Sequence, residues 1–299
     1  LINCATASWY DFQRQDCATT TVIRGDVRIY IANLHSGTIQ VFNLDALDHP
    51  MTTISNGTNP FGMAMAGDLL FISDFDELAD TGKLHIVNMI SDTMVASYAV
   101  GAHPIHIAYY DGHVYVTSHS SPPALTVVDI TQGQIVAQPV LNRPHTAEFG
   151  FFGASTDAHR GRVYVTKRDF GSLGIWVLTP PSGSGEWVTE WVYPLDETNR
   201  EKPSSILYHP TTDRVYVTFG LIDELWILDP DTWTRLDRIS TGHQDPVDPG
   251  YGGHGLAALG QCVFVSNYLD QSITAVVDGS CTENWKPRAS STSALYKIY

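Results

Sequence analysis

Twelve histidines occur in the sequence, and several stand where an apolar, strand-like segment begins or ends. His106 and His254 lie just inside such segments, and Lys167 and Arg168 directly follow one. Imidazoles titrate near neutral pH and accept protons, whereas arginine and lysine neutralise anionic groups of a substrate. The catalytic candidates are therefore His106, His145, His254, Tyr268 and Arg168, and the substrate-binding candidates are Lys167, Arg143, His119, His35 and Tyr251.

These residue types predict chemistry on an acidic sugar. Removal of the proton beside a uronate carboxylate requires a cation that masks the carboxylate, a base, and an acid that serves the leaving oxygen. One of the candidate histidines would be the base. Arg168 or Lys167 would mask the carboxylate, and Tyr268 or Tyr251 would donate the proton. The predicted function is a polysaccharide lyase that cleaves uronate-containing glycans by β-elimination, with an acidic oligo- or polysaccharide as its partner.

The same imidazoles could instead hold a metal ion. Three neutral imidazoles suit a transition metal, and the candidates are His106, His145 and His254. The sequence contains neither an H-x-H nor an H-E-x-x-H motif. Four aspartates offer oxygen ligands for Ca²⁺ without a recognisable loop motif: Asp74, Asp76, Asp245 and Asp248. We expect a divalent cation, Ca²⁺ or a transition metal, in a central channel.

A repeated segment predicts the elements that position these residues. Val114–Thr117 reads Val-Tyr-Val-Thr, and the same four letters recur at 163–166 and 215–218. Looser copies stand at 29–32, 70–73 and 263–266, so that the six copies are roughly 40 to 50 residues apart. Each copy follows an apolar strand and a tight turn, and two further strand-like segments come after it. The sequence predicts an all-β propeller of four-stranded blades, with six blades favoured and seven as the alternative.

The Val-Tyr-Val-Thr copies and the apolar strands before them resemble the YVTN-repeat family of β-propellers and its lactonase-like and quinoprotein-like relatives. The resemblance covers residues 20–280, and it implies the fold more strongly than the function, because this fold carries many activities. Family members often have seven blades. A seventh blade could come from residues 179–202 or from the two ends of the chain. We expect residues 1–299 to form one propeller domain whose ring is closed by terminal strands.

Antiparallel strands sort the histidines between two faces of such a ring. Connections into the first strand and out of the second strand emerge on one face, which we call the rim, and turns between these two strands emerge on the other. His35, His106, His119, His145 and His254 belong to the rim, together with Arg143, Lys167, Arg168 and Lys202. His113, His159 and His209 fall on the opposite face, where we expect solvated turn residues. His103 and His106 should point to opposite sides of an extended segment, which argues against a shared ligand.

Composition limits the partners. The net charge is −15, which opposes binding to nucleic acid or to an anionic membrane surface. Hydrophobic residues make up 43% and charged residues 16%, so the chain can bury a large core. No apolar run reaches the roughly 18 residues of a membrane-spanning helix. We expect a monomer without membrane insertion.

The cysteines favour an oxidising compartment. Four cysteines allow three pairings, and the near-neighbour pairing, Cys4 with Cys17 and Cys262 with Cys281, would fasten the two chain ends. Asn56-Gly57-Thr58 is a glycosylation sequon, and the chain begins at Leu1, as a chain does after a signal peptide has been removed. We expect a secreted, extracellular glycoprotein, with four free thiols in a cytosolic protein as the alternative.

Two other functions fit the same fold. A non-catalytic propeller would hold a glycan or a protein segment with its rim aromatics and polar groups. A metal-dependent lactonase-like hydrolase would need acidic ligands in the channel, and Glu148 is the acidic residue expected on a first strand.

Overall fold

The structure is a computed structural model of the 299-residue chain. It describes residues 2–3, 19–20, 28–33, 36–43, 49–55, 57–119, 124–139, 151–169, 172–181, 186–192, 203–219, 222–241, 253–259, 262–267 and 272–277. For Arg168, His254 and Cys262 it describes the backbone alone. The segments expected to close the ring, around residues 8–10 and 294–299, lie outside this description.

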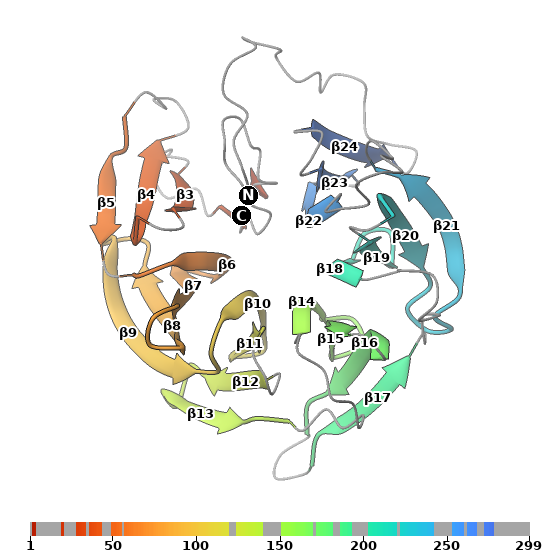
Figure 1. Ribbon diagram of the computed structural model, residues 1–299, viewed down its shortest axis with the longest axis horizontal. Coiled ribbons are helices and arrows are strands. Elements are labelled where there is room, and N and C mark those ends of the chain that lie inside the picture. Colours follow the sequence, from red (N-terminus) through yellow and green to blue (C-terminus); the bar gives the residue numbers. More distant parts are fainter. Residues whose placement is uncertain are drawn as a thin grey trace.

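All secondary structure in the described residues is β-strand, arranged as sheets around a centre (Figure 1). Four sheets have four strands: β6(Pro60–Ala66), β7(Leu69–Asp76), β8(Thr81–Asn88) and β9(Thr93–Val100); β10(Pro104–Tyr110), β11(His113–Ser118), β12(Ala124–Asp129) and β13(Gln134–Ala137); β14(Phe151–Asp157), β15(Arg162–Asp169), β16(Ser172–Thr179) and β17(Val188–Val192); β18(Pro203–His209), β19(Arg214–Phe219), β20(Glu224–Leu228) and β21(Arg235–Ser240).

Two sheets have three described strands, and one pair of strands stands apart. The three-stranded sheets are β3(Arg28–Asn33), β4(Thr38–Asn43) and β5(Thr52–Ser55), and β22(Gly253–Leu259), β23(Cys262–Asn267) and β24(Ser272–Val277); the pair is β1(Ile2–Asn3) and β2(Thr19–Thr20). Each three- or four-stranded sheet contains one copy of the repeated segment. The fold is a β-propeller, as the repeat predicts.

Each sheet is an antiparallel meander that runs outward from the centre. In the β6–β9 sheet the first strand is innermost and the fourth is outermost (Figure 1). The innermost strands β6, β10, β14, β18 and β22 contact one another in order around the ring. Among the described residues, no helix has the length and apolar character needed to cross a membrane.

The core lies between neighbouring sheets. The two valines of each Val-Tyr-Val-Thr copy are fully buried, and so is its tyrosine. Tyr164, for example, packs in one cluster with Val215 and Trp226 of the next sheet. Burial of apolar side chains on both faces of a sheet explains the unbroken apolar character of these strands.

The fourth residue of the repeat has a specific structural role. The first strand of a sheet begins with a β-bulge, seen between Pro60 and Met63 and at the same place in four other sheets. The Thr166 hydroxyl accepts the bulge N–H of Gly153 at 2.7 Å and donates to the Ser204 carbonyl of the next sheet at 3.3 Å. Ser73, Thr117 and Thr218 accept the corresponding N–H groups. The hydroxyl therefore closes the bulge and, at Thr166, also joins neighbouring sheets.

A close approach of two inner strands explains one glycine. A Cβ atom at Gly62 would stand 2.0 Å from the carbonyl oxygen of Ile105 in the neighbouring sheet. No side chain fits in that space, so the backbones of β6 and β10 can meet only where glycine occupies this position.

Candidate functional site

Strand pairing places the predicted rim at one end of the sheets. Pro60 pairs with Asp74, Pro104 with Ser118, Phe151 with Lys167, Pro203 with Phe219, and Gly253 with Asn267. His106, Lys167, Arg168 and His254 therefore lie at the same end of their sheets. Their proposed roles in catalysis and substrate binding remain predictions.

The predicted start of one first strand, β14, was wrong. The sequence pattern places His145 one residue after a leading proline at the start of a first strand, but β14 begins at Phe151. Phe152 and Gly153 hold the positions that His145 and Thr146 were expected to fill. Glu148 likewise precedes the strand on which it was expected. The bulge that marks the start of a first strand falls between Phe151 and Ala154. Pro144 therefore does not mark the start of this strand.

Two described rim candidates are buried. His106 is 2% exposed and Lys167 is 3% exposed. The backbone N–H of His106 donates to the Thr117 hydroxyl at 3.1 Å, as part of the bulge described above. Neither side chain is accessible to a polysaccharide in this conformation. His119, by contrast, is partly exposed.

Most other candidates lie outside the described residues. For His254, Arg168 and Cys262 the description covers backbone only, and the remaining candidates are outside it altogether: His35, His145, Arg143, Tyr251, Tyr268, Cys4, Cys17 and Cys281. The disulfide pairings and the three-histidine metal site are therefore untested predictions.

Among the residues that the structure describes, no group of three or more His, Cys, Asp or Glu side chains could hold a metal ion. The oxygens of two expected Ca²⁺ ligands already accept hydrogen bonds. Asp74 Oδ1 accepts the N–H groups of Thr58 and Asn59, each at 2.7 Å, and Asp76 Oδ1 accepts the N–H of Leu78 at 3.0 Å. Asp245 and Asp248 are outside the described ranges.

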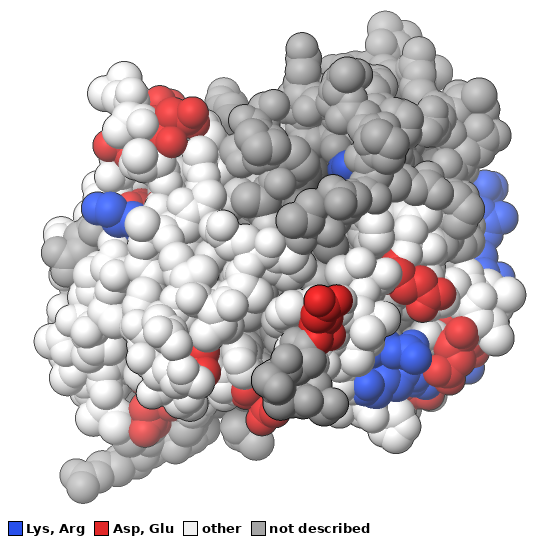
Figure 2. Space-filling model, turned by 90° about the horizontal axis from the view of Figure 1, so that it is seen from below, with Lys and Arg blue, Asp and Glu red and all other residues white. Residues whose placement is uncertain are grey.

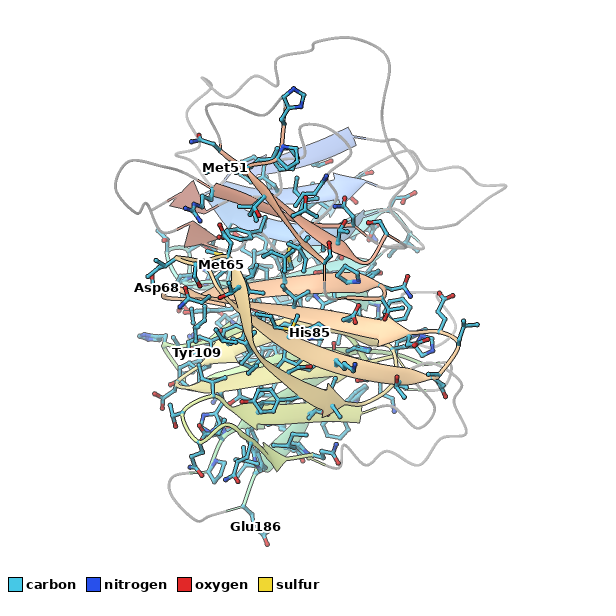
Figure 3. The ribbon with its side chains drawn as sticks, turned by 90° about the vertical axis from the view of Figure 1, so that its left-hand side faces the viewer. Met51, Met65, Asp68, His85, Tyr109 and Glu186 are labelled. Carbon is cyan, nitrogen blue, oxygen red and sulfur yellow. The ribbon has the colours of Figure 1, made fainter. Side chains whose placement is uncertain are left out.

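Asp74 also forms a buried pair that sequence reasoning missed. Its Oδ2 lies 3.2 Å from His85 Nε2, and the two residues are 4% and 3% exposed. His85 belongs to β8, a third strand, where a polar residue at a buried position was the available signal (Figure 3). The pair ties the segment before β6 to β8, which is a structural role.

A cluster of partly exposed aromatic and polar side chains centres on His103. The His103 ring stacks on Phe75 with a centroid distance of 5.2 Å, and Phe75 lies 6.4 Å from Phe61. His103 Nε2 stands 3.2 Å from Asp80 Oδ1. All three rings are partly exposed, and the His103 side chain is 35% exposed. We call Phe61, Phe75, Asp80 and His103 the His103 site.

The backbone fixes the imidazole in this place. His103 has a φ of 49°, in the left-handed region, which costs a residue with a side chain about 1 kcal/mol. Its carbonyl accepts the N–H of His119 at 2.8 Å, which holds the segment between β9 and β10 against the end of β11. A strained residue held by a hydrogen bond, a stacked ring and a carboxylate is a preorganised group.

Sequence reasoning passed over His103 because it considered that residue only as a metal ligand beside His106. The two side chains do differ as expected, since His106 is buried and His103 is partly exposed. Phe61 and Phe75 are not among the residues that the sequence analysis considered for a site. The contact of Phe75 with His103 depends on how the end of β7 meets the segment before β10, which no local pattern records.

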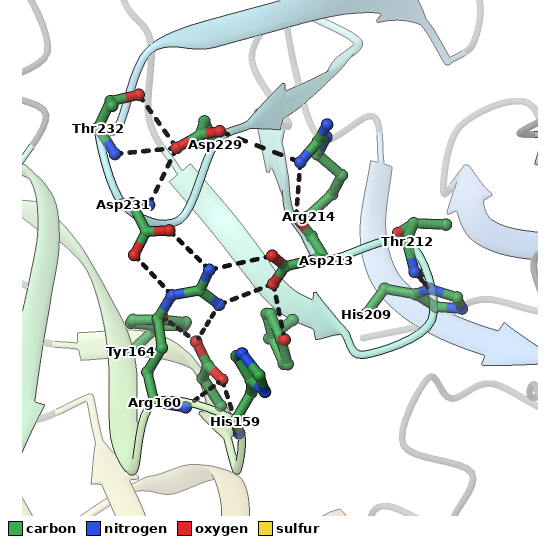
Figure 4. A network of polar contacts seen from close by, with 12 residues as sticks. His159, Arg160, Tyr164, His209, Thr212, Asp213, Arg214, Asp229, Asp231 and Thr232 are labelled. Atoms are coloured by element: carbon green, nitrogen blue, oxygen red, sulfur yellow. Dashed lines mark hydrogen bonds and ion pairs between the residues drawn. The ribbon is translucent and has the colours of Figure 1, made fainter.

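The opposite face is structural in the described residues. His159 is exposed there and His113 is partly exposed, as expected. The expectation for His209 was wrong, because it is 2% exposed and lies 3.0 Å from the Thr212 hydroxyl. Figure 4 shows the main feature of this face, the Arg160 guanidinium surrounded by carboxylates from the end of β14 and from two turns of the β18–β21 sheet.

Comparisons with known proteins agree on the fold. No protein-family model and no curated protein matches the chain, so the likeness to the YVTN family stays a resemblance. The structure of hydrazine synthase from Kuenenia stuttgartiensis is similar, with a TM-score of 0.72, 14% identity, and coverage of 89% of this chain and 84% of that one. A functionally unknown protein from Desulfotomaculum acetoxidans is similar with a TM-score of 0.61, 11% identity, and coverage of 89% of this chain and 81% of that one. The RRP9 WD40 repeats are similar with a TM-score of 0.59, 13% identity, and coverage of 84% of this chain and 76% of that one. At these identities the likeness shows that the chain has the β-propeller fold and does not assign its activity.

Proposed function

We propose that this propeller is a non-catalytic glycan-binding protein whose His103 site holds a neutral sugar. The observation that carries the proposal is the stacked, partly exposed Phe75–His103 pair with Asp80 at the imidazole. Sugar rings present C–H faces that pack on aromatic rings and hydroxyl groups that bond to imidazole and carboxylate groups. Aromatic surface with a few fixed polar groups is the usual composition of a small-ligand site.

The charge around the site favours a neutral ligand over the acidic glycan expected from the sequence. Asp80 is 77% exposed, and Glu77 is exposed on the same β7–β8 turn. The whole chain carries −15. A uronate would approach carboxylates here, and like charges at close range are unfavourable.

The polysaccharide lyase remains the alternative hypothesis. Its described members His106 and Lys167 are buried, so a glycan would have to reach side chains that the folded chain covers. The hypothesis now rests on His145, His254, Arg168 and Tyr268. Nothing described favours the metal-dependent hydrolase over it. Secretion, glycosylation at the sequon and an extracellular location fit a glycan ligand and stay proposals.

A glycan array that includes neutral and uronate-containing oligosaccharides, followed by calorimetry on any hit, tests the proposal. We expect binding to a neutral glycan, and at least tenfold weaker binding by His103→Ala and by Phe75→Ala. His113→Ala is the matched control, because this imidazole is similarly exposed, at 33%, but lies on the opposite face. Absence of binding, or binding that both site variants leave unchanged, would overturn the proposal.

A further inference from the structure

The tyrosine of each Val-Tyr-Val-Thr copy lies buried between its own sheet and the next one. Tyr164 of β15 is 0% exposed and Tyr216 of β19 is 1% exposed. The Tyr164 hydroxyl donates to Asp157 Oδ2 at 2.6 Å, and the Tyr216 hydroxyl lies 3.3 Å from Thr212 Oγ1. In these two sheets the chain itself supplies a polar partner for the buried phenol, as a buried O–H requires.

Tyr115 of β11 is the exception among the three exact copies. It is 0% exposed, and its hydroxyl has no hydrogen-bond partner among the described residues. The strand register shows which acceptor is missing. Asp157 is the last residue of β14 and pairs with Arg162, whereas the last residue of β10, Tyr110, pairs with His113. A second phenol therefore stands where the neighbouring sheet has the accepting carboxylate.

The ring contacts of the two phenols match, so the difference lies in the acceptor. Trp187 meets the Tyr115 ring edge-on, with a centroid distance of 5.9 Å and an interplanar angle of 81°. Trp233 meets the Tyr164 ring in the same way, at 5.1 Å and 88°. Each tryptophan lies just before the fourth strand of the following sheet. Tyr115 is therefore oriented between β10–β13 and β14–β17 as Tyr164 is oriented between the next two sheets.

A second polar group lies at the same interface. The Tyr110 side chain is partly exposed, and its hydroxyl stands 3.4 Å from the position that a Cβ atom would take at Gly161, in the β14–β15 turn. A buried O–H without an acceptor is costly, because it has lost its hydrogen bonds to solvent. Buried water molecules occupy places of this kind, where they bond to polar groups that have no other partner.

The charge nearby favours a neutral acceptor over an anion. Burial, followed by the nearness of Tyr110 and Asp111, raises the pKa of Tyr115. Asp111 is exposed, and the whole chain carries −15. Figure 2 looks onto the outer side of the ring, where described basic side chains appear at a few places only. An anion would meet unfavourable like charges here, whereas a water molecule accepts the phenol proton without adding charge.

We propose that a bound water molecule between the β10–β13 and β14–β17 sheets accepts the hydrogen bond of Tyr115, in the place that the Asp157 carboxylate fills at Tyr164. The buried tyrosine of the repeat then donates or bonds to a carboxylate, a hydroxyl or a water molecule in three successive sheets. This site goes beyond the proposed glycan binding and does not depend on the His103 site.

A high-resolution crystal structure of the wild-type protein tests the site directly. Density for a water oxygen should appear about 2.5–3.0 Å from Tyr115 Oη. The structure of the Tyr115→Phe variant should lack this water.

Urea unfolding supplies a second readout whose sign separates the alternatives. Tyr115→Phe should lower the unfolding midpoint, because the native phenol loses a hydrogen bond. If the hydroxyl had no acceptor, its removal would relieve a buried unsatisfied group and raise the midpoint. Tyr164→Phe is the matched control and should lower the midpoint further, because the buried Asp157 carboxylate loses a donor. No density beside Tyr115 Oη, or a midpoint of Tyr115→Phe at or above that of the wild type, would overturn the proposal.

Discussion

The Arg160 guanidinium binds both carboxylate oxygens of Asp231, from Nε at 2.7 Å and from Nη2 at 2.8 Å. It binds Asp213 in the same two-pronged way, at 2.7 and 3.0 Å, and reaches the buried Asp157 at 3.2 Å. Arg160 belongs to the β14–β15 turn, whereas Asp213 and Asp231 belong to two turns of the β18–β21 sheet. One side chain therefore clamps two blades together.

Replacement of Arg160 by alanine should lower the free energy of unfolding by about 2 kcal/mol, mainly because the fully buried Asp157 carboxylate loses its cation. Arg160→Lys should recover only part of this loss, since an ammonium cannot form the paired contacts. Urea unfolding measures both. Arg214→Ala is the control: Arg214 is 37% exposed and 4.0 Å from Asp229, and its loss should cost under about 0.5 kcal/mol. Equal losses for the alanine variants of Arg160 and Arg214 would refute the clamp.

The clamp should weaken in acid. Hydrogen bonds from Arg160 lower the pKa of Asp213 to about 2, against about 3.9 in an unfolded chain. Between these values the unfolded state binds more protons, so this contribution to stability is complete above about pH 4 and is lost as the pH falls toward 2. Unfolding free energies measured across this range should fall less steeply for Asp213→Asn than for the wild type. Parallel curves would show that Asp213 is not the titrating partner.

Thr166→Val should destabilise the fold by about 1–3 kcal/mol, because the buried N–H of Gly153 loses its acceptor while the volume stays nearly constant. Thr189→Val changes an exposed threonine of β17 and should have an effect close to zero. Thermal unfolding followed by circular dichroism compares the two variants. If Thr166→Val unfolds like the wild type, the hydroxyl is dispensable and the repeat's fourth residue needs another explanation.

The lyase hypothesis predicts an ultraviolet-absorbing unsaturated product when the protein is incubated with uronate-containing polysaccharides. His145→Ala and His254→Ala should then abolish product formation, because one of these histidines would be the base. His159→Ala, exposed on the opposite face, should leave the rate unchanged. Lack of product with every polysaccharide would contradict the lyase hypothesis. If a neutral glycan also binds, the binding function is the one that stands. Elemental analysis of the same preparation tests for the expected divalent cation.

The architecture could be read from the sequence because the repeat is a local pattern with a global consequence. Six copies at a steady spacing fix the number of repeat strands, and alternating turns fix which ends of the strands share a face. The register of Pro60 with Asp74 and of Pro104 with Ser118 follows from that pattern alone. The position of His145 was predicted wrongly because the first strand of its blade begins with Phe151, whereas three other first strands begin with a proline.

Burial and loop contacts could not be read in the same way. Sharing a rim does not decide whether a side chain faces solvent, and His106 and Lys167 turn out to be covered. The His103 site joins the β7–β8 turn, the start of β6 and the segment before β10, three places that are distant in sequence. Such meetings depend on the angle between blades, which the repeat leaves open.

The location of the core between blades has a consequence for synthesis on the ribosome. Tyr164 reaches the burial seen in the finished wheel only after Val215 and Trp226 have been translated, some 50 to 60 positions later. A newly translated sheet therefore exposes one apolar face until the next sheet has left the ribosome. Slow elongation just after a blade would lengthen the time for which this apolar face is exposed, and chaperones would have longer to bind it.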